Sequence, residues 1–153
     1  MKTSEISMQK LAIKSGLLIF ACLIVYFLLM KYMGLIHIME LRALNFFILL
    51  GGIFFAFRYY KIKTKKQIEY LPGLLLGCFI SIVSILSFAL FVGLYFSMID
   101  PQLLLELRGN SPIMGDYITP LSMVITIIIE GMCSGLIISF SFMQYYQNDA
   151  THI

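Results

Sequence analysis

The sequence predicts an all-α membrane protein, built as an antiparallel bundle of four transmembrane helices. Of its 153 residues, 60% are hydrophobic and only 12% are charged, and the mean hydropathy is +0.93. Soluble domains are about 45–50% apolar and about 25% charged, so a soluble fold of this length would leave much apolar surface in water. The apolar residues also form four separate runs, each near the length of about 20 residues that crosses a bilayer.

The four runs place the predicted spans at about residues 14–36, 41–60, 73–99 and 118–145, within a single domain of residues 1–153. Backbone groups in hydrocarbon must pair within their own segment, and the runs lack the two-residue alternation of membrane strands. Each span is therefore expected to be a helix. No small-residue cleavage site follows the first run, which predicts an uncleaved signal anchor.

Lysine and arginine predict the orientation of the bundle. Eight of the eleven basic residues lie in the amino-terminal arm and around the connection after the second span: Lys2, Lys10, Lys14, Arg58, Lys61, Lys63, Lys65 and Lys66. The other side holds only Lys31, Arg42 and Arg108. Because basic residues collect on the cytoplasmic side of a membrane, both termini are expected in the cytoplasm.

The longest outer connection, residues 100–116, is predicted to contain a short helix. Asp100 can cap this helix, Pro101 suits its first position and Gly109 suits its end. The residues between them read QLLLELR, so we expect one or two helical turns in the outer membrane interface. This segment could act as a lid or a partner surface, or only connect two spans with its leucines among the headgroups.

A glutamate interrupts the fourth span near its centre. Glu130 lies within a turn of the bilayer midplane, and its short side chain does not reach water easily. A charge there is costly, so Glu130 is expected to be neutral and is a functional hypothesis by default. Ser122, Thr126 and Ser134 recur with it every four residues and Ser141 follows, which puts one polar row on one helix face.

Small residues predict what this polar row faces. Gly131 and Gly135 form a stripe beside Glu130 that permits close approach of another helix. The third span offers a matching face of small residues: Gly73, Gly77, Ser81, Ser84 and Ser87. We expect the two spans to pack through these faces, with the Glu130 carboxyl hydrogen-bonded to Ser84 or Ser87. Further candidate partners are Asn45, Tyr26 and Arg42.

Two hypotheses for Glu130 stay open at this stage. It could be a neutral hydrogen-bonding residue that fixes helix register or oligomerisation, or it could titrate or contact a cation, as in proton-coupled carriers. The sequence shows no internal repeat of the kind common in transporters. A single four-helix unit is also narrow for a pore, so the carrier hypothesis requires self-association.

The sequence carries no recognisable catalytic, metal or cofactor pattern. Cys22, Cys78 and Cys133 lie one per span, without the spacing of a redox pair or a metal site. His37 and His152 have no ligand partner at useful spacing. The net charge of +3 reflects topology and does not indicate nucleic-acid binding. We therefore expect no enzymatic activity, no catalytic residues, no cofactor and no metal.

Four stretches carry a family resemblance: GIFFAFRYYK, YLPGLLLG, MIDPQ and TPLSMVITIIIEGMCSGLIISFSF. Their order resembles a family of small bacterial four-span membrane proteins of unknown function, over nearly the whole chain. The resemblance implies a location in the bacterial inner membrane and implies no activity. A looser likeness links ELRALN, Glu40 to Asn45, to the charged motif of four-span glutathione-dependent membrane enzymes, although the spacing differs.

These patterns predict a structural or partner-binding component of the membrane. Its expected partners are the lipid bilayer and either a second copy or another membrane protein. The alternative is a small oligomeric proton- or cation-coupled transporter that uses Glu130. A membrane enzyme of the four-span type is a third option.

Overall fold

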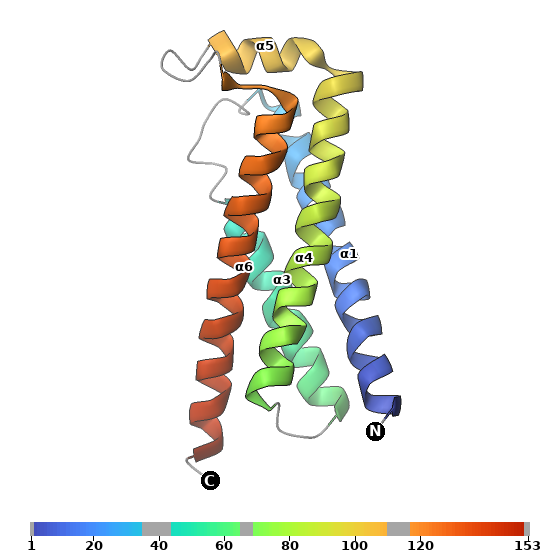
Figure 1. Ribbon diagram of the computed structural model, residues 1–153, viewed down its shortest axis with the longest axis vertical. Helices are drawn as coiled ribbons and strands as arrows, with labels where there is room; N and C mark the ends of the chain where they lie inside the picture. The colour runs from blue at the N-terminus through green and yellow to red at the C-terminus, as the bar shows by residue number, and fades with distance from the viewer. Residues whose placement is uncertain (1, 35–43, 65–68, 110–116, 152–153) are drawn as a thin grey trace.

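The computed structural model describes residues 2–34, 44–64, 69–109 and 117–151 (Figure 1). Regular structure in these ranges is helical: α1 (Lys2–Tyr32), α3 (Leu44–Thr64), α4 (Tyr70–Leu94), the π-helical turn η1 (Tyr95–Ile99), α5 (Pro101–Gly109) and α6 (Pro120–Thr151). Four stretches are long and apolar enough to cross a membrane: Met8–Tyr32, Leu44–Ile62, Tyr70–Ile99 and Pro120–Tyr145. The predicted helical class is confirmed, and the four long apolar helices give the chain the character of a multi-pass membrane protein.

Helix α1 ends earlier than predicted. The first span was expected to reach residue 36, but α1 stops at Tyr32 and the backbone turns at Gly34 with a φ of 67°. Glycine adopts this left-handed conformation without steric cost, and the Gly34 N–H donates to the Lys31 carbonyl over 3.0 Å. Residues 35 and 36, and the predicted start of the second span at 41–43, lie outside the described residues.

Helix α4 runs through η1 into α5, which lies across the end of the bundle away from the two termini, here called the distal end (Figure 1). The Asp100 N–H donates to the Tyr95 carbonyl at 3.0 Å and closes the π-helical turn. The Asp100 carboxylate then accepts a 3.1 Å hydrogen bond from the Leu103 N–H. Pro101 begins α5 and Gly109 ends it, so the predicted helix and its cap are confirmed.

Helix α6 begins with a reciprocal cap. The Thr119 N–H donates to Ser122 Oγ at 2.8 Å, and the Ser122 N–H donates back to Thr119 Oγ1 at 3.1 Å. The two residues satisfy backbone donors at the helix start, in the manner of a capping box. Pro120 takes the first helical position, where no donor is needed. Ser122 therefore serves the start of the helix as well as standing in the predicted polar row.

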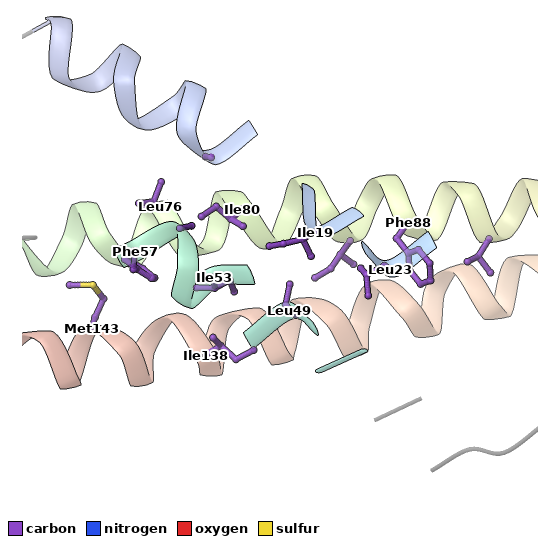
Figure 2. Packing of buried hydrophobic residues seen from close by; sticks show 14 of the residues in the cluster. Ile19, Leu23, Leu49, Ile53, Phe57, Leu76, Ile80, Phe88, Ile138 and Met143 are labelled. Atoms are coloured by element: carbon purple, nitrogen blue, oxygen red, sulfur yellow. The ribbon is translucent and has the colours of Figure 1, made fainter. Parts of the chain in front are cut away.

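Helix α4 is the centre of the packing, with α6 along one side and α1 along another. Helix α3 contacts α1, α4 and α6. Figure 2 shows the resulting core between these helices, in which α3 inserts Leu49, Ile53 and Phe57 beside Leu76 and Ile80 of α4 and Ile138 and Met143 of α6. Between helices in lipid, van der Waals packing is a principal driving force, so the fit of these side chains decides which faces meet.

Candidate functional site

Two matching glycine–serine pairs form the contact between α4 and α6. Gly77 and Ser81 lie four residues apart on α4, as do Gly135 and Ser139 on α6. The helices run antiparallel, so Ser139 packs on Gly77 while Ser81 packs on Gly135. A Cβ atom added at Gly77 would lie 2.7 Å from the Cβ of Ser139, which leaves no room for a side chain. The pairs therefore set how closely the two backbones approach.

Both serines satisfy their hydroxyl groups within their own helix. Ser81 Oγ donates to the Gly77 carbonyl at 2.9 Å, and Ser139 Oγ donates to the Gly135 carbonyl at 2.7 Å. An unpaired hydroxyl in an apolar contact is costly, and these bonds avoid that cost. Ser139 was not predicted from the sequence. The signal that reveals it is the repeated G-x-x-x-S spacing, in GCFIS on the third span and GLIIS on the fourth.

The prediction that the polar row with Glu130 faces the third span is wrong. Thr126, Glu130 and Ser141 are exposed on the surface of the bundle, and Ser134 is half-buried. Ser84, the predicted partner of Glu130, is fully buried, and its hydroxyl donates to the Ile80 carbonyl at 2.9 Å. The row is therefore presented to the surroundings of the bundle.

The rotation of α6 about its axis decides whether its glycine row or its polar row meets α4. Each residue turns an α-helix by about 100°, so Gly131 and Gly135 point about 100° and 140° away from Glu130. Gly131 lies against Ile85, and a Cβ added there would lie 2.7 Å from Ile85 Cδ1. The glycine row occupies the contact with α4 because the absence of side chains allows the closer packing, and this turns Glu130 outward.

Five exposed residues of α6 lie in one row with Glu130, which we call the outer seam: Thr126, Glu130, Cys133, Ile137 and Ser141. The exposed side chains of Ile129, Leu136 and Phe140 lie beside this row. Their spacing of four, three, four and four residues resembles the spacing at which two helices meet along their length. The midpoint of this membrane span lies between residues 132 and 133. At a rise of 1.5 Å per residue, Glu130 is within about 4 Å of mid-depth.

Hydroxyl groups on and beside the outer seam bond to the backbone of α6. Thr126 Oγ1 donates to the Ser122 carbonyl at 2.8 Å, Ser134 Oγ to the Glu130 carbonyl at 2.7 Å, and Ser141 Oγ to the Ile137 carbonyl at 2.8 Å. Each hydroxyl oxygen keeps lone pairs that can accept a further hydrogen bond. The surface near the carboxyl of Glu130 therefore offers additional acceptors.

The other predicted site residues lie at different places in the bundle. Ser87 and Tyr26 are half-buried on α4 and α1, and Gly73 is buried in the first turn of α4. Asn45 lies in the first turn of α3, and its Oδ1 is buried with no hydrogen-bond partner among the described residues. Arg42 lies outside the described residues.

A polar cluster at the distal end was not predicted from the sequence. Lys31 Nζ lies 2.8 Å from Asp100 Oδ2, donates to the Tyr95 hydroxyl and lies 4.9 Å from the centre of the Tyr95 ring. The ammonium group and the Leu103 N–H hold the pKa of Asp100 below its usual range. From the sequence, Lys31 contributes only to the predicted orientation of the spans, because the contact joins residues of different spans.

Aromatic rings and a second hydrogen bond hold the distal end in place. The Phe27 ring of α1 lies edge-to-face on Tyr95 and Phe88, with centroids 5.2 and 6.4 Å apart. At the other end of α5, Arg108 Nε donates to the Ile118 carbonyl at 2.6 Å. Helix α5 is thus tied to α1 at its start and to the residues before α6 at its end.

Comparison with known proteins adds no family to this description. No protein-family model, curated protein or solved structure matches the chain. In the described part of the chain, no three His, Cys, Asp or Glu side chains group closely enough to hold a metal ion. The resemblance to small bacterial four-span proteins stays a prediction, and the outer seam is the candidate site that rests on the chain's own geometry.

Proposed function

We propose that this chain is a non-enzymatic component of the bacterial inner membrane that binds another membrane-embedded helix through the outer seam of α6. The observation that carries the proposal is the exposure of Glu130 near mid-depth of its span. Contact between a carboxyl group and acyl chains is costly. A covering helix would keep acyl chains away from this face and pack along it.

The side chains of the outer seam also favour a helix over lipid. Thr126, Cys133 and Ser141 are small, which allows another backbone to come close. Large apolar side chains flank the row on the same exposed face of α6, namely Ile129, Leu136 and Phe140, and would pack on either side of a helix seated on it.

The outward position of Glu130 favours partner binding over the carrier alternative. A carrier exposes its site to water on each side of the membrane in turn, whereas Glu130 is exposed on the outer surface of the bundle. A carrier built from this chain would need self-association. Its test is Glu130→Gln in proteoliposomes: loss of pH-dependent uptake supports a carrier, and unchanged uptake contradicts it.

Photocrosslinking in native membranes tests the proposed function. A photoreactive phenylalanine analogue replaces Ile137, which is on the outer seam and 62% exposed. The matched control places the same analogue at Phe55 of α3, which is 70% exposed. We expect a discrete protein adduct from position 137 and lipid adducts from position 55. Capture of lipid alone from position 137 would contradict partner binding.

The proposed location includes an orientation with both termini in the cytoplasm. Single cysteines at Gln102 of α5 and Lys61 of α3, both exposed, would lie on opposite sides of the membrane. In a chain whose native cysteines are replaced by alanine, a membrane-impermeant maleimide should modify only position 102 in intact bacterial cells. Modification of position 61 instead would reverse the orientation.

A further inference from the structure

We infer that the outward face of α3, here called the α3 face, binds an anionic phospholipid, with the headgroup phosphate on Arg58 and an acyl chain laid along Gly51. This face belongs to a different helix from the outer seam, so the inference goes beyond the proposed function. Its members recur every three or four residues and therefore share one side of α3: Leu44, Phe47, Gly51, Phe55, Arg58 and Ile62. The four large apolar side chains among them are between 43% and 70% exposed.

Arg58 is an exposed cation that has no acidic partner in the described part of the chain. Lys31 at the distal end differs, because its ammonium group pairs with Asp100 at 2.8 Å. Lys61, three residues after Arg58, adds a second exposed cation to this end of α3. The charge of Arg58 is therefore available to a phosphate of the surrounding lipid.

The depth of Arg58 favours a lipid over a soluble partner. The span Leu44–Ile62 is centred on residue 53, so the Cα of Arg58 lies about 8 Å from mid-depth at a rise of about 1.5 Å per residue. The hydrocarbon extends to about 15 Å from mid-depth, and the long side chain places its guanidinium group toward the headgroups. A lipid phosphate lies there, whereas an acidic group of a soluble protein would have to pass between the headgroups.

Gly51 leaves room for an acyl chain between two phenylalanine rings. Among the described residues, no atom lies within 4 Å of a Cβ added at Gly51. Phe47 and Phe55, four residues to either side, are 64% and 70% exposed. The open space lies on the same side of α3 as Arg58 and about 10 Å along the axis, toward the middle of the bilayer. A lipid whose phosphate meets Arg58 thus runs an acyl chain past Phe55 to Gly51.

The charge of the α3 face selects an anionic headgroup over a zwitterionic one. A zwitterionic headgroup carries its own cation beside the phosphate, which offsets part of the attraction to Arg58. An anionic headgroup leaves the phosphate charge uncompensated. Each lysine or arginine near the membrane surface favours such a lipid about fivefold, and Lys61 acts in the same direction as Arg58.

Quenching of a single tryptophan by brominated lipid tests the inference. The chain has no tryptophan, so Phe55→Trp places one fluorophore on the α3 face. This variant is reconstituted in phosphatidylcholine vesicles with a minor share of acyl-brominated phosphatidylglycerol or, in a parallel sample, of acyl-brominated phosphatidylcholine. We expect the quenching curves to show at least about fivefold stronger binding of the anionic lipid. Equal quenching by the two lipids would overturn the inference.

Two substitutions at similar depth locate the phosphate. Lys14 of α1 is also exposed, and its Cα lies about 9 Å from the middle of the span Met8–Tyr32. In the Phe55→Trp chain, Arg58→Gln should lower the preference for anionic lipid about fivefold. Lys14→Gln removes the same charge from the neighbouring helix and should lower it less than about twofold. Equal losses would indicate diffuse attraction to the end of the bundle opposite the distal end, and the assignment to the α3 face would be wrong.

Gly51→Leu tests the position of the acyl chain. The added side chain occupies the open space beside Phe55 without displacing any described atom, so the variant should fold and the brominated anionic lipid should quench the tryptophan at position 55 less. Unchanged quenching would contradict the placement of the acyl chain. In native membranes, a protein adduct from the photoreactive analogue at position 55 would show that a protein covers the α3 face. That result would overturn the lipid site whatever position 137 captures.

Discussion

Helices α4 and α6 carry the same G-x-x-x-S pattern and use it in one shared contact, yet their other polar residues end in opposite environments. In the most apolar part of α4, 50% of residues are buried inside the bundle, against 11% in α6. Ser84 of α4 is fully buried, whereas Thr126 and Glu130 of α6 are exposed. The difference arises because α4 has neighbours on several sides, while α6 lies at an edge.

This comparison shows that a polar row on a membrane helix does not by itself indicate the inside of the bundle. A serine can bond to its own backbone, as Ser81 and Ser139 do, and is then tolerated in a dry contact. A glutamate is far more costly to expose to hydrocarbon. The outward position of Glu130 is therefore the reason that we propose a partner for this face of α6.

The largest effect on the free energy of unfolding is expected when serine is replaced by leucine on the inner face of α6, in comparison with the same replacement on its outer face. Ser139 is fully buried against Gly77, whereas Ser141 is exposed two residues later. Ser139→Leu should lower the free energy of unfolding by about 3 kcal/mol, because the added carbons force the two helices apart. Ser141→Leu should change it by less than about 0.5 kcal/mol.

Thermal or denaturant unfolding in detergent measures both values. The unsubstituted chain is the reference, and Gly51→Leu is a second control, since no atom lies within 4 Å of a Cβ added at Gly51. Equal destabilisation by the two serine variants would contradict the assignment of inner and outer faces on α6.

A smaller loss of unfolding free energy is expected when one serine hydroxyl is removed from α4 or from α6. Ser84 of α4 and Ser134 of α6 both donate to a backbone carbonyl of their own helix. Ser84→Ala should cost about 1 kcal/mol of unfolding free energy, because the buried carbonyl of Ile80 loses one hydrogen bond away from solvent. Ser134→Ala should cost less, since that site is half-buried. A larger loss of unfolding free energy from Ser134→Ala than from Ser84→Ala would contradict the assignment of the buried site to α4.

The smallest effect on stability is expected at the distal end, where Asp100, just before α5, pairs with Lys31 of α1. The pKa of Asp100 is lowered by Lys31 and by the Leu103 N–H. The ionised carboxylate therefore stabilises the fold above its unfolded pKa of about 3.9, and this stabilisation is lost as the pH falls through the lower folded pKa. Asp100→Asn should lower the melting temperature at neutral pH, by an amount that shrinks in acid.

Melting curves between neutral and acidic pH check this prediction. Glu106→Gln is the matched control, because Glu106 is an exposed acid of the same helix α5. We expect that variant to keep the acid-dependent loss of stability seen in the unsubstituted chain. A pH-independent difference between Asp100→Asn and the unsubstituted chain would show that the ion pair with Lys31 does not stabilise the fold.

Local features of the fold were predictable from the sequence. Hydropathy located the four spans, and the positions of Asp100, Pro101 and Gly109 predicted α5 with its cap. These features depend on neighbours within one or two helical turns. The early end of α1 was missed because Gly34 interrupts an otherwise apolar run.

Contacts between spans were harder to predict. The sequence pointed to the small residues of the third and fourth spans, and Gly77, Ser81, Gly131 and Gly135 do lie where α4 meets α6. It did not predict Ser139 or the Lys31–Asp100 pair, and it placed Glu130 on the wrong side of its helix. Each of these depends on how two distant segments are rotated and aligned.

The sequence by itself determined that four apolar helices exist and that one of them carries a carboxyl group near its centre, because length and hydropathy are properties of each segment alone. Only the tertiary structure decided which face of α6 meets α4. Helix α6 has a row of glycines and a row of polar residues on different faces, and only one face can pack on α4. The glycine row makes that contact because it allows closer packing. Glu130 is turned outward as a consequence.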